Sequence, residues 1–176
     1  MFARTERLLL RPGWPEDAAA LKDAIGKETV ALDFAKVPWP YDISDAEAYL
    51  GRPRSEDEVD LLIFARTMGA PRLIGGIGLA RDGDDVELGY WIVPSHWGLG
   101  FATEAGRAVV AMARDSLRVD ELIAGHFVDN PASGHVLRKL GFSDTGHVYE
   151  RENRARGMTV PCRRFGLSFN AVALAA

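Results

Sequence analysis

The chain has 176 residues, the length of one domain, and we expect a single domain over residues 1–176. Hydrophobic residues (47%) and charged residues (26%) are close to the averages of globular proteins, which excludes a disordered tail and a fibrous repeat. Because 25 acidic residues outnumber 21 basic ones, the net charge is −4, and we expect no nucleic-acid partner.

Two further features bear on location and metal binding. No apolar run approaches the ~18 residues that a membrane-spanning helix requires, so we expect no membrane partner. The single cysteine, Cys162, can form neither an internal disulfide nor a thiolate metal site. We therefore expect a cytoplasmic protein without a metal ion.

The N-terminal part of the chain predicts a strand, a helix and a loop. Residues 6–12 are the predicted strand, and residues 16–25 are predicted to be a helix because their apolar side chains recur on one face. Residues 36–43 contain two prolines, which exclude a regular element and predict a loop.

A second helix and three strands are predicted next. Ser44 and Glu47 have the spacing of a capping box, so the helix is predicted over residues 44–50. Short polar turns separate the strands, which predicts antiparallel hairpins. The three strand-like runs are residues 60–68, 72–81 and 86–94.

The C-terminal half alternates helices and strands. Residues 102–117 have helical periodicity, and residues 121–128 are apolar enough for a buried strand. Asn130 and Pro131 are typical of a helix start, and Gly141 is typical of a helix end. A final hairpin is predicted from residues 142–150 and 162–169.

The order of these elements predicts the fold class. We expect an α/β (α+β) domain with a mixed, mostly antiparallel central sheet of about seven strands, flanked by about four helices. No internal repeat or low-complexity linker interrupts the order.

The turn around Gly98 and Gly100 lies between a predicted strand and a predicted helix. Glycines let the backbone approach a ligand, and the unpaired N–H groups of the next helix favour an anion such as a pyrophosphate. A P-loop is excluded because Phe101 stands where lysine is required. A dinucleotide fingerprint is disfavoured because Thr103 stands where the third glycine belongs.

The same stretch resembles motif A of the GCN5-related N-acetyltransferases (GNAT). It is most similar to the branch of the ribosomal-protein alanine N-acetyltransferases, in which Trp97 replaces the usual arginine or glutamine. The segments that carry the resemblance are Gly89-Tyr90-Trp91, residues 97–105, residues 5–12, residues 38–40 with 45–50, and residues 130–133 with 136–142. The resemblance implies the GNAT fold, with acetyl-CoA as co-substrate and direct attack by an amine in a ternary complex.

The resemblance also implies where acetyl-CoA is held. Backbone N–H groups of residues 99–103 would bind the pyrophosphate, and a β-bulge around residues 91–93 would separate two strands for the pantetheine arm. The N–H of Ile92 or Val93 would polarise the thioester carbonyl. The implied cofactor-binding residues are Ile92, Val93, Trp97, Gly98, Leu99, Gly100, Phe101, Ala102, Thr103, Asn130 and Ser133.

Two residues are the main candidates for catalysis, and His126 is the other candidate general base because histidine suits proton transfer near neutral pH. The resemblance makes Ser133 a general acid toward the leaving thiolate; the alternative is a solvated serine in the first turn of a helix. Glu87 shares a strand face with Trp91 and is a candidate general base acting through water. The alternative is a solvated or salt-bridged strand glutamate. Asn130 either caps its helix or also binds the pantetheine arm. Cys162 lacks any neighbour that would activate a thiolate and is expected to be structural.

The acceptor is expected to be a small-molecule amine or a protein N-terminal amine. The residues predicted to bind it are Trp39, Tyr41, Trp91 and His126, although a strand histidine is commonly structural. A homodimer is one open expectation for the assembly. The alternative function is a non-catalytic module that binds or senses acyl-CoA.

Overall fold

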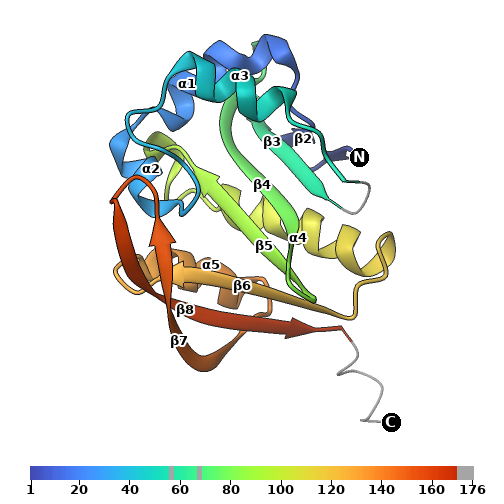
Figure 1. Ribbon diagram of the computed structural model, residues 1–176. Coiled ribbons are helices and arrows are strands. Elements are labelled where there is room, and N and C mark those ends of the chain that lie inside the picture. The colour runs from blue at the N-terminus through green and yellow to red at the C-terminus, as the bar shows by residue number, and fades with distance from the viewer. Residues whose placement is uncertain (56–57, 67–68, 170–176) are drawn as a thin grey trace.

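The computed structural model describes residues 1–55, 58–66 and 69–169. One mixed sheet of eight strands forms the centre of this part of the chain, in the order β1-β2-β3-β4-β5-β6-β8-β7 (Figure 1). The strands are β1 (Ala3–Arg4), β2 (Leu8–Arg11), β3 (Val59–Ala65), β4 (Arg72–Asp82), β5 (Asp85–Ile92), β6 (Glu121–Phe127), β7 (Ser143–Asn153) and β8 (Met158–Ser168). The α-helices are α1 (Ala18–Ile25), α2 (Glu28–Asp33), α3 (Ile43–Gly51), α4 (Phe101–Asp115) and α5 (Pro131–Lys139).

The predicted fold class is confirmed. Every neighbouring pair is antiparallel except β5 and β6, which are parallel. α4 packs on β2, β4 and β5, and α5 packs on β6, while α1 packs on α3 and β4. Figure 1 shows α4 and α5 behind the sheet and α1 and α3 at its upper end. Among the described helices, none is long and apolar enough to cross a membrane.

β5 and β6 separate after a short pairing. Glu87 pairs with Ile123 and Leu88 with Ala124, and beyond these residues β5 continues with β4 as its partner in the described structure. The β4–β5 register is regular through Ile92, so the predicted β-bulge around residues 91–93 is wrong. β6 instead continues along its whole length with β8 as its partner.

Several short or polar elements differ from the prediction. α3 begins at Ile43 with Asp42 as its cap, because the Asp42 N–H donates to Asp45 at 2.8 Å; Ser44 and Glu47 lie inside the helix. α2 was not predicted, nor was β1 as a separate strand, so five α-helices and eight strands replace the expected four and seven. β7 and β8 are longer than predicted and meet at a turn over residues 154–157.

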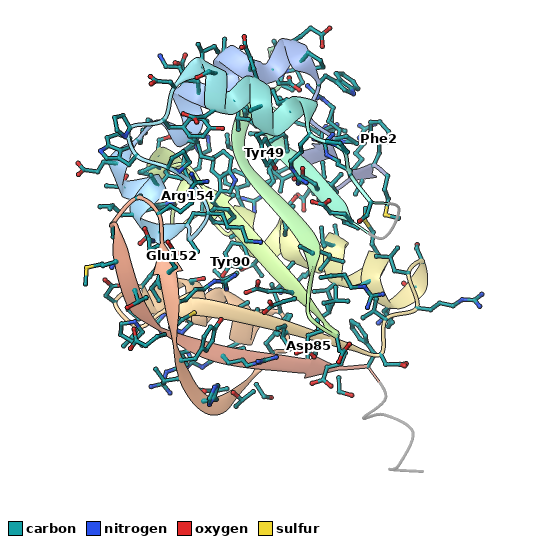
Figure 2. All side chains as sticks on the ribbon, viewed as in Figure 1. Phe2, Tyr49, Asp85, Tyr90, Glu152 and Arg154 are labelled. Atoms are coloured by element: carbon teal, nitrogen blue, oxygen red, sulfur yellow. The ribbon has the colours of Figure 1, made fainter. Side chains whose placement is uncertain are left out.

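The tip of the β7–β8 hairpin is tied to the end of α2 and to the segment that follows it. Asn153 is fully buried, and its side-chain N–H donates to the Leu32 carbonyl at 2.9 Å. The Arg154 N–H donates to the Ala35 carbonyl at 3.0 Å. Figure 2 labels Arg154 near this tip. The hairpin therefore bridges from the β6 side of the sheet to the α2 side, across the gap between β5 and β6.

An ion pair fixes the start of α1 and predicts a pH-dependent stability. Arg11 donates two hydrogen bonds to Asp17 at 2.7 and 2.8 Å, and the Trp14 N–H donates a third at 2.8 Å. Burial alone would raise the pKa of Asp17, but these bonds outweigh it and hold the pKa below its usual range. A depressed carboxyl pKa stabilises the fold above the unfolded pKa, and this stabilisation is lost as the pH falls through the folded pKa.

Asp17→Asn is therefore expected to lower the free energy of unfolding by about 2 kcal/mol at pH 7. The loss should shrink as the pH falls from about 4, the ordinary aspartate pKa, through the lower folded pKa, where the wild-type carboxyl becomes protonated. Urea titrations over this pH range measure the loss of unfolding free energy at each pH. Asp115→Asn is the control, because Asp115 pairs with Arg114 on the surface and should be neutral. A loss that is independent of pH would contradict the charge argument.

Candidate active site

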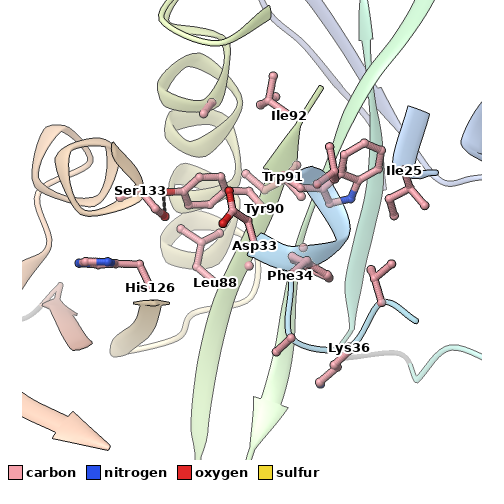
Figure 3. A pocket seen from close by; sticks show the side chains of 18 of the residues that line it. Ile25, Asp33, Phe34, Lys36, Leu88, Tyr90, Trp91, Ile92, His126 and Ser133 are labelled. Carbon is pink, nitrogen blue, oxygen red and sulfur yellow. Dashed lines mark hydrogen bonds between the residues drawn. The ribbon is translucent and has the colours of Figure 1, made fainter. Parts of the chain in front are cut away.

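A cavity of about 940 Å³ lies where β5 and β6 part (Figure 3). Residues at the starts of α4 and α5 form one wall of the cavity. Residues of α2, of the loop after α2 and of α3 form the opposite wall. Residues from the open edge of β5 lie between these two sides. The cavity therefore connects the glycine turn to the segment predicted to face the acceptor.

The glycine turn has the backbone conformation that an anion site requires. Gly98 and Gly100 have φ values of +72° and +81°, in the region that favours glycine. Gly100 caps α4, and its carbonyl accepts the Glu104 N–H at 3.0 Å. The N–H groups of residues 101–103 precede this first helical bond and have no partner within the helix. These residues line the cavity, together with Trp97, Gly98 and Gly100, whereas Leu99 lies outside its wall.

The open edge of β5 offers one of the two predicted amides. The Val93 N–H donates to the Ile74 carbonyl at 2.8 Å, so Val93 is already paired with β4. Antiparallel pairs alternate between bonded and non-bonded, so the amides of Tyr90 and Ile92 point away from β4, into the gap. The Ile92 carbonyl accepts the Trp97 indole N–H at 2.6 Å. Ile92 fits the predicted role, and Val93, a buried residue outside the cavity wall, does not.

Ser133 lies in the first turn of α5 and faces β5. Its backbone N–H donates to the Asn130 side chain at 3.3 Å, so Asn130 caps the helix. Its hydroxyl lies 2.7 Å from the Tyr90 hydroxyl, which is also 2.9 Å from the Ser133 carbonyl. Burial raises the pKa of Tyr90 to about 12, so the phenol is neutral at physiological pH. Asn130 and Ser133 both line the cavity.

Glu87 forms an ion pair with Arg151 of β7. Both carboxylate oxygens accept from the guanidinium, one of them at 2.8 Å from Nη2. Both side chains line the cavity, and that of Glu87 is 13% exposed. The hydrogen bonds that Arg151 donates to Glu87, the largest influence, raise the pKa of Arg151 above its usual range. Of the two predicted environments for Glu87, the salt-bridged one is observed.

The comparison with known families decides which family the chain belongs to. The model of the acetyltransferase (GNAT) domain matches residues 7–143. This chain belongs to the GNAT acetyltransferase family. YoaA of Bacillus subtilis, named an uncharacterized N-acetyltransferase, is 42% identical over 77 residues, or 42% of this chain and 44% of YoaA. The chain spans about half the length of the curated relatives it matches.

Solved structures of two Vibrio enzymes share the fold of this GNAT domain. One is a ribosomal-protein-S5-alanine acetyltransferase from Vibrio fischeri, with a TM-score of 0.81, 13% identity, and coverage of 97% of this chain and 98% of that one. The other is a spermidine N-acetyltransferase from Vibrio cholerae in complex with CoA and spermine, with a TM-score of 0.76, 20% identity, and coverage of 93% and 96%. At these identities the likeness concerns the fold alone.

His126 and Cys162 have structural surroundings in the GNAT domain. His126 is buried, and its Nδ1–H donates to the Phe127 carbonyl at 2.8 Å. Its Nε2 lies under α5, where a Cβ at Gly134 would come within 2.6 Å of it. Cys162 is buried, and burial raises the pKa of its thiol, so it remains protonated. Both residues line the cavity.

The predicted acceptor-binding aromatics separate into two groups. Tyr41 and Trp91 line the cavity, and the Trp91 indole crosses β4 at Gly76, where a Cβ would lie 2.5 Å from its Nε1. Trp39 is 38% exposed and is absent from the cavity wall, so the structure does not bring it to the site. Among the described residues, no group of His, Cys, Asp or Glu side chains is arranged to hold a metal ion.

A clamp on the glycine turn was missed by the sequence reasoning. Arg7 donates from Nε to Glu104 at 2.7 Å and from Nη1 to the Leu99 carbonyl at 3.0 Å, and its guanidinium lies 4.3 Å from the centre of the Phe101 ring. Burial would raise the pKa of Glu104, but hydrogen bonds from Thr5 and Arg7 hold it below its usual range. The signal was present in the resemblance of residues 5–12, which supply both donors.

Arg151→Met is expected to lower the free energy of unfolding by about 2 kcal/mol, because it leaves the Glu87 carboxylate half-enclosed without its partner. The additional change Glu87→Gln removes that charge and should restore part of the loss, about 1 kcal/mol. Urea unfolding of the two single variants and the double variant measures the coupling. Strictly additive losses would show that the pair is not coupled.

Proposed function

We propose that this GNAT domain transfers an acetyl group from acetyl-CoA to a primary amine, by direct attack in a ternary complex. One observation carries the proposal: the free amides of the glycine turn open into the same cavity as the unpaired edge of β5. An anion site at a helix start, continued by free strand amides, suits a pyrophosphate joined to an amide-containing arm.

The residues fit acetyl-CoA in the following roles. The amides of residues 101–103 bind the pyrophosphate, and the Tyr90–Ile92 edge pairs with the pantetheine arm, to which Asn130 also has access. Bound acetyl-CoA supplies the acetyl thioester. The Ile92 N–H polarises the thioester carbonyl, and Ser133 stands at the helix start where a leaving thiolate is stabilised.

The acceptor side is lined by Tyr41, Trp91 and Glu87. An amine attacks only when it is neutral, so its ammonium proton must leave first. A carboxylate has about four lone-pair positions, and the Arg151 pair occupies two of them, which leaves Glu87 able to accept from a water molecule. We infer that Glu87 is the base, acting through water, and that the acceptor is a small-molecule amine or a protein N-terminal amine, as the names of the Vibrio enzymes suggest.

Calorimetric titration tests the cofactor. Saturable binding of acetyl-CoA without binding of NADH is the expected result. A folded protein that does not bind acetyl-CoA would overturn the proposal, and binding of NADH instead would revive a dinucleotide site.

A second candidate function is a non-catalytic acyl-CoA-binding module. The ion pair of Glu87 with Arg151 favours it, because that carboxylate is already neutralised. Thiol release from acetyl-CoA, followed across a panel of polyamines, amino acids and peptides with free N-termini, separates the two. Turnover with any amine supports the transferase, while tight binding with no turnover across the panel supports the binding module.

A further inference from the structure

Tyr90 makes a pair of contacts that the proposed roles leave unexplained. Its hydroxyl lies 2.7 Å from the Ser133 hydroxyl and 2.9 Å from the Ser133 carbonyl, and the dashed line in Figure 3 joins the two side chains across the gap. The pleat of β5 turns Tyr90 toward α5, while its neighbour Trp91 lies against β4. Both hydrogen-bond partners of the Tyr90 hydroxyl therefore belong to Ser133.

The number of hydrogens limits how this pair is arranged. Each hydroxyl carries one hydrogen, and a carbonyl can only accept. If Ser133 donates to Tyr90, the serine has no hydrogen left for a ligand. If Tyr90 donates, its hydrogen is directed at the Ser133 oxygens, and the Ser133 hydrogen is free to turn into the cavity. In the first arrangement the Tyr90 hydrogen goes to the Ser133 carbonyl, so both hydrogens are used inside the pair. The second arrangement needs one Tyr90 hydrogen shared by the two Ser133 oxygens, at 2.7 and 2.9 Å, and it is the one that frees the serine hydrogen for a ligand.

We propose that Tyr90 is a positioning residue: as the thiolate forms, it donates to the Ser133 oxygens and so leaves the serine hydroxyl hydrogen for the sulfur of the leaving group. The inference rests on the proposed function. When the amine attacks, the C–N bond forms, the C–S bond breaks, and the electron pair of that bond goes to sulfur. The Ser133 O–H stabilises the thiolate by a hydrogen bond, and the proton lost by the amine balances the one finally gained by sulfur.

Tyr90 itself keeps its proton throughout. Its pKa of about 12 is well above the ~8.5 of an ordinary thiol, so transfer from the phenol to the thiolate is unfavourable. The same property makes Tyr90 a constant donor over the pH range in which the thiolate forms. Tyr90 thus acts through the orientation of Ser133.

Free CoA is the probe, because its thiol titrates at the proposed site and needs no acceptor. The ultraviolet absorbance of the thiolate, followed against pH for enzyme-bound CoA, gives the pKa of the bound thiol. In the wild type this pKa should be lower than that of free CoA. Tyr90→Phe and Ser133→Ala should each raise it by about one unit, a tenfold loss of thiolate at a given pH. The double variant should show no further rise.

Affinity and folding provide the controls. The affinity for CoA at low pH, where sulfur is a thiol, should change less than threefold in each variant, since the amides of the turn are untouched. Tyr149→Phe is matched to Tyr90→Phe, because it also removes a part-buried phenol oxygen, but one that contacts Cys162 and Arg151 and lies outside the cavity wall. It should leave the pKa of bound CoA unchanged. The fall in its thermal midpoint shows how much stability is lost when a part-buried phenol oxygen is removed.

Each outcome is decisive. A Tyr90→Phe effect that persists in full in the Ser133→Ala background would overturn the proposal, because Tyr90 would then not act through the serine. If Tyr90→Phe does not fold, Ser133→Ala still decides: an unchanged pKa of bound CoA would show that the serine hydroxyl does not reach sulfur. Failure of the wild type to bind CoA at all would instead refute the proposed function.

Discussion

Gly100→Trp is expected to lower the affinity for acetyl-CoA at least about 100-fold while the domain remains folded. A residue other than glycine at φ +81° is strained by roughly 1–2 kcal/mol, which favours a different loop conformation. The added side chain also meets Arg7, whose Nη2 lies 3.6 Å from the Cβ position. Displacing Arg7 releases the Leu99 carbonyl and Glu104, so the amides no longer converge. Two lost bonds to a charged phosphate, at about 1.5–3 kcal/mol each, account for the factor.

Gly83→Trp is the matched control. Gly83 has φ +63° and lies in the turn between β4 and β5, with nothing within 4 Å of a Cβ at this position. It carries the same kind of backbone strain away from the cavity wall. Calorimetry with acetyl-CoA and a thermal melt should show similar midpoints for the two variants and loss of binding in Gly100→Trp alone. Unaltered affinity in Gly100→Trp would refute the pyrophosphate site, and equal losses would assign the effect to strain.

Elements with a strong local pattern were predicted closely. The β4–β5 hairpin follows from two apolar runs around a polar turn, and α4 follows from an apolar stripe of helical period. α2 has six residues and β1 has two, too few for a period to show. Residues 151–153 of β7 were missed because their side chains, Arg-Glu-Asn, are all polar and show no apolar alternation, although Asn153 is fully buried.

The candidate site also has a part that could be predicted from the sequence and a part that could not. The glycine turn was readable because strand, turn and helix are contiguous in the sequence. The partners that orient the site come from far along the chain: Arg7 and Glu104 are 97 residues apart, Glu87 and Arg151 are 64 apart, and Tyr90 and Ser133 are 43 apart. Such pairs depend on the tertiary packing that brings side chains of β7 and α5 to those of β5, and no local pattern encodes them.

Ser133→Ala is expected to lower kcat about 10- to 100-fold and to change the KM for acetyl-CoA less than threefold. A hydrogen bond to a charged group contributes about 1.5–3 kcal/mol, and here the charge is on sulfur only as the C–S bond breaks. The Asn130 cap survives the change, because it uses the Ser133 backbone N–H. Steady-state rates with an amine found in the panel, followed by thiol release, provide the measurement.

Ser143→Ala is the control for this prediction, since Ser143 is an exposed serine at the start of β7, outside the cavity wall. The split between kcat and KM distinguishes the roles open to Ser133. A serine that only binds the pantetheine arm contacts acetyl-CoA equally in the ground state and the transition state, so its loss would raise KM with kcat unchanged. A serine that only begins the helix would change neither. A fall in kcat alone requires a contact that strengthens as the thiolate forms, which is the role that the Tyr90 hydrogen bond prepares.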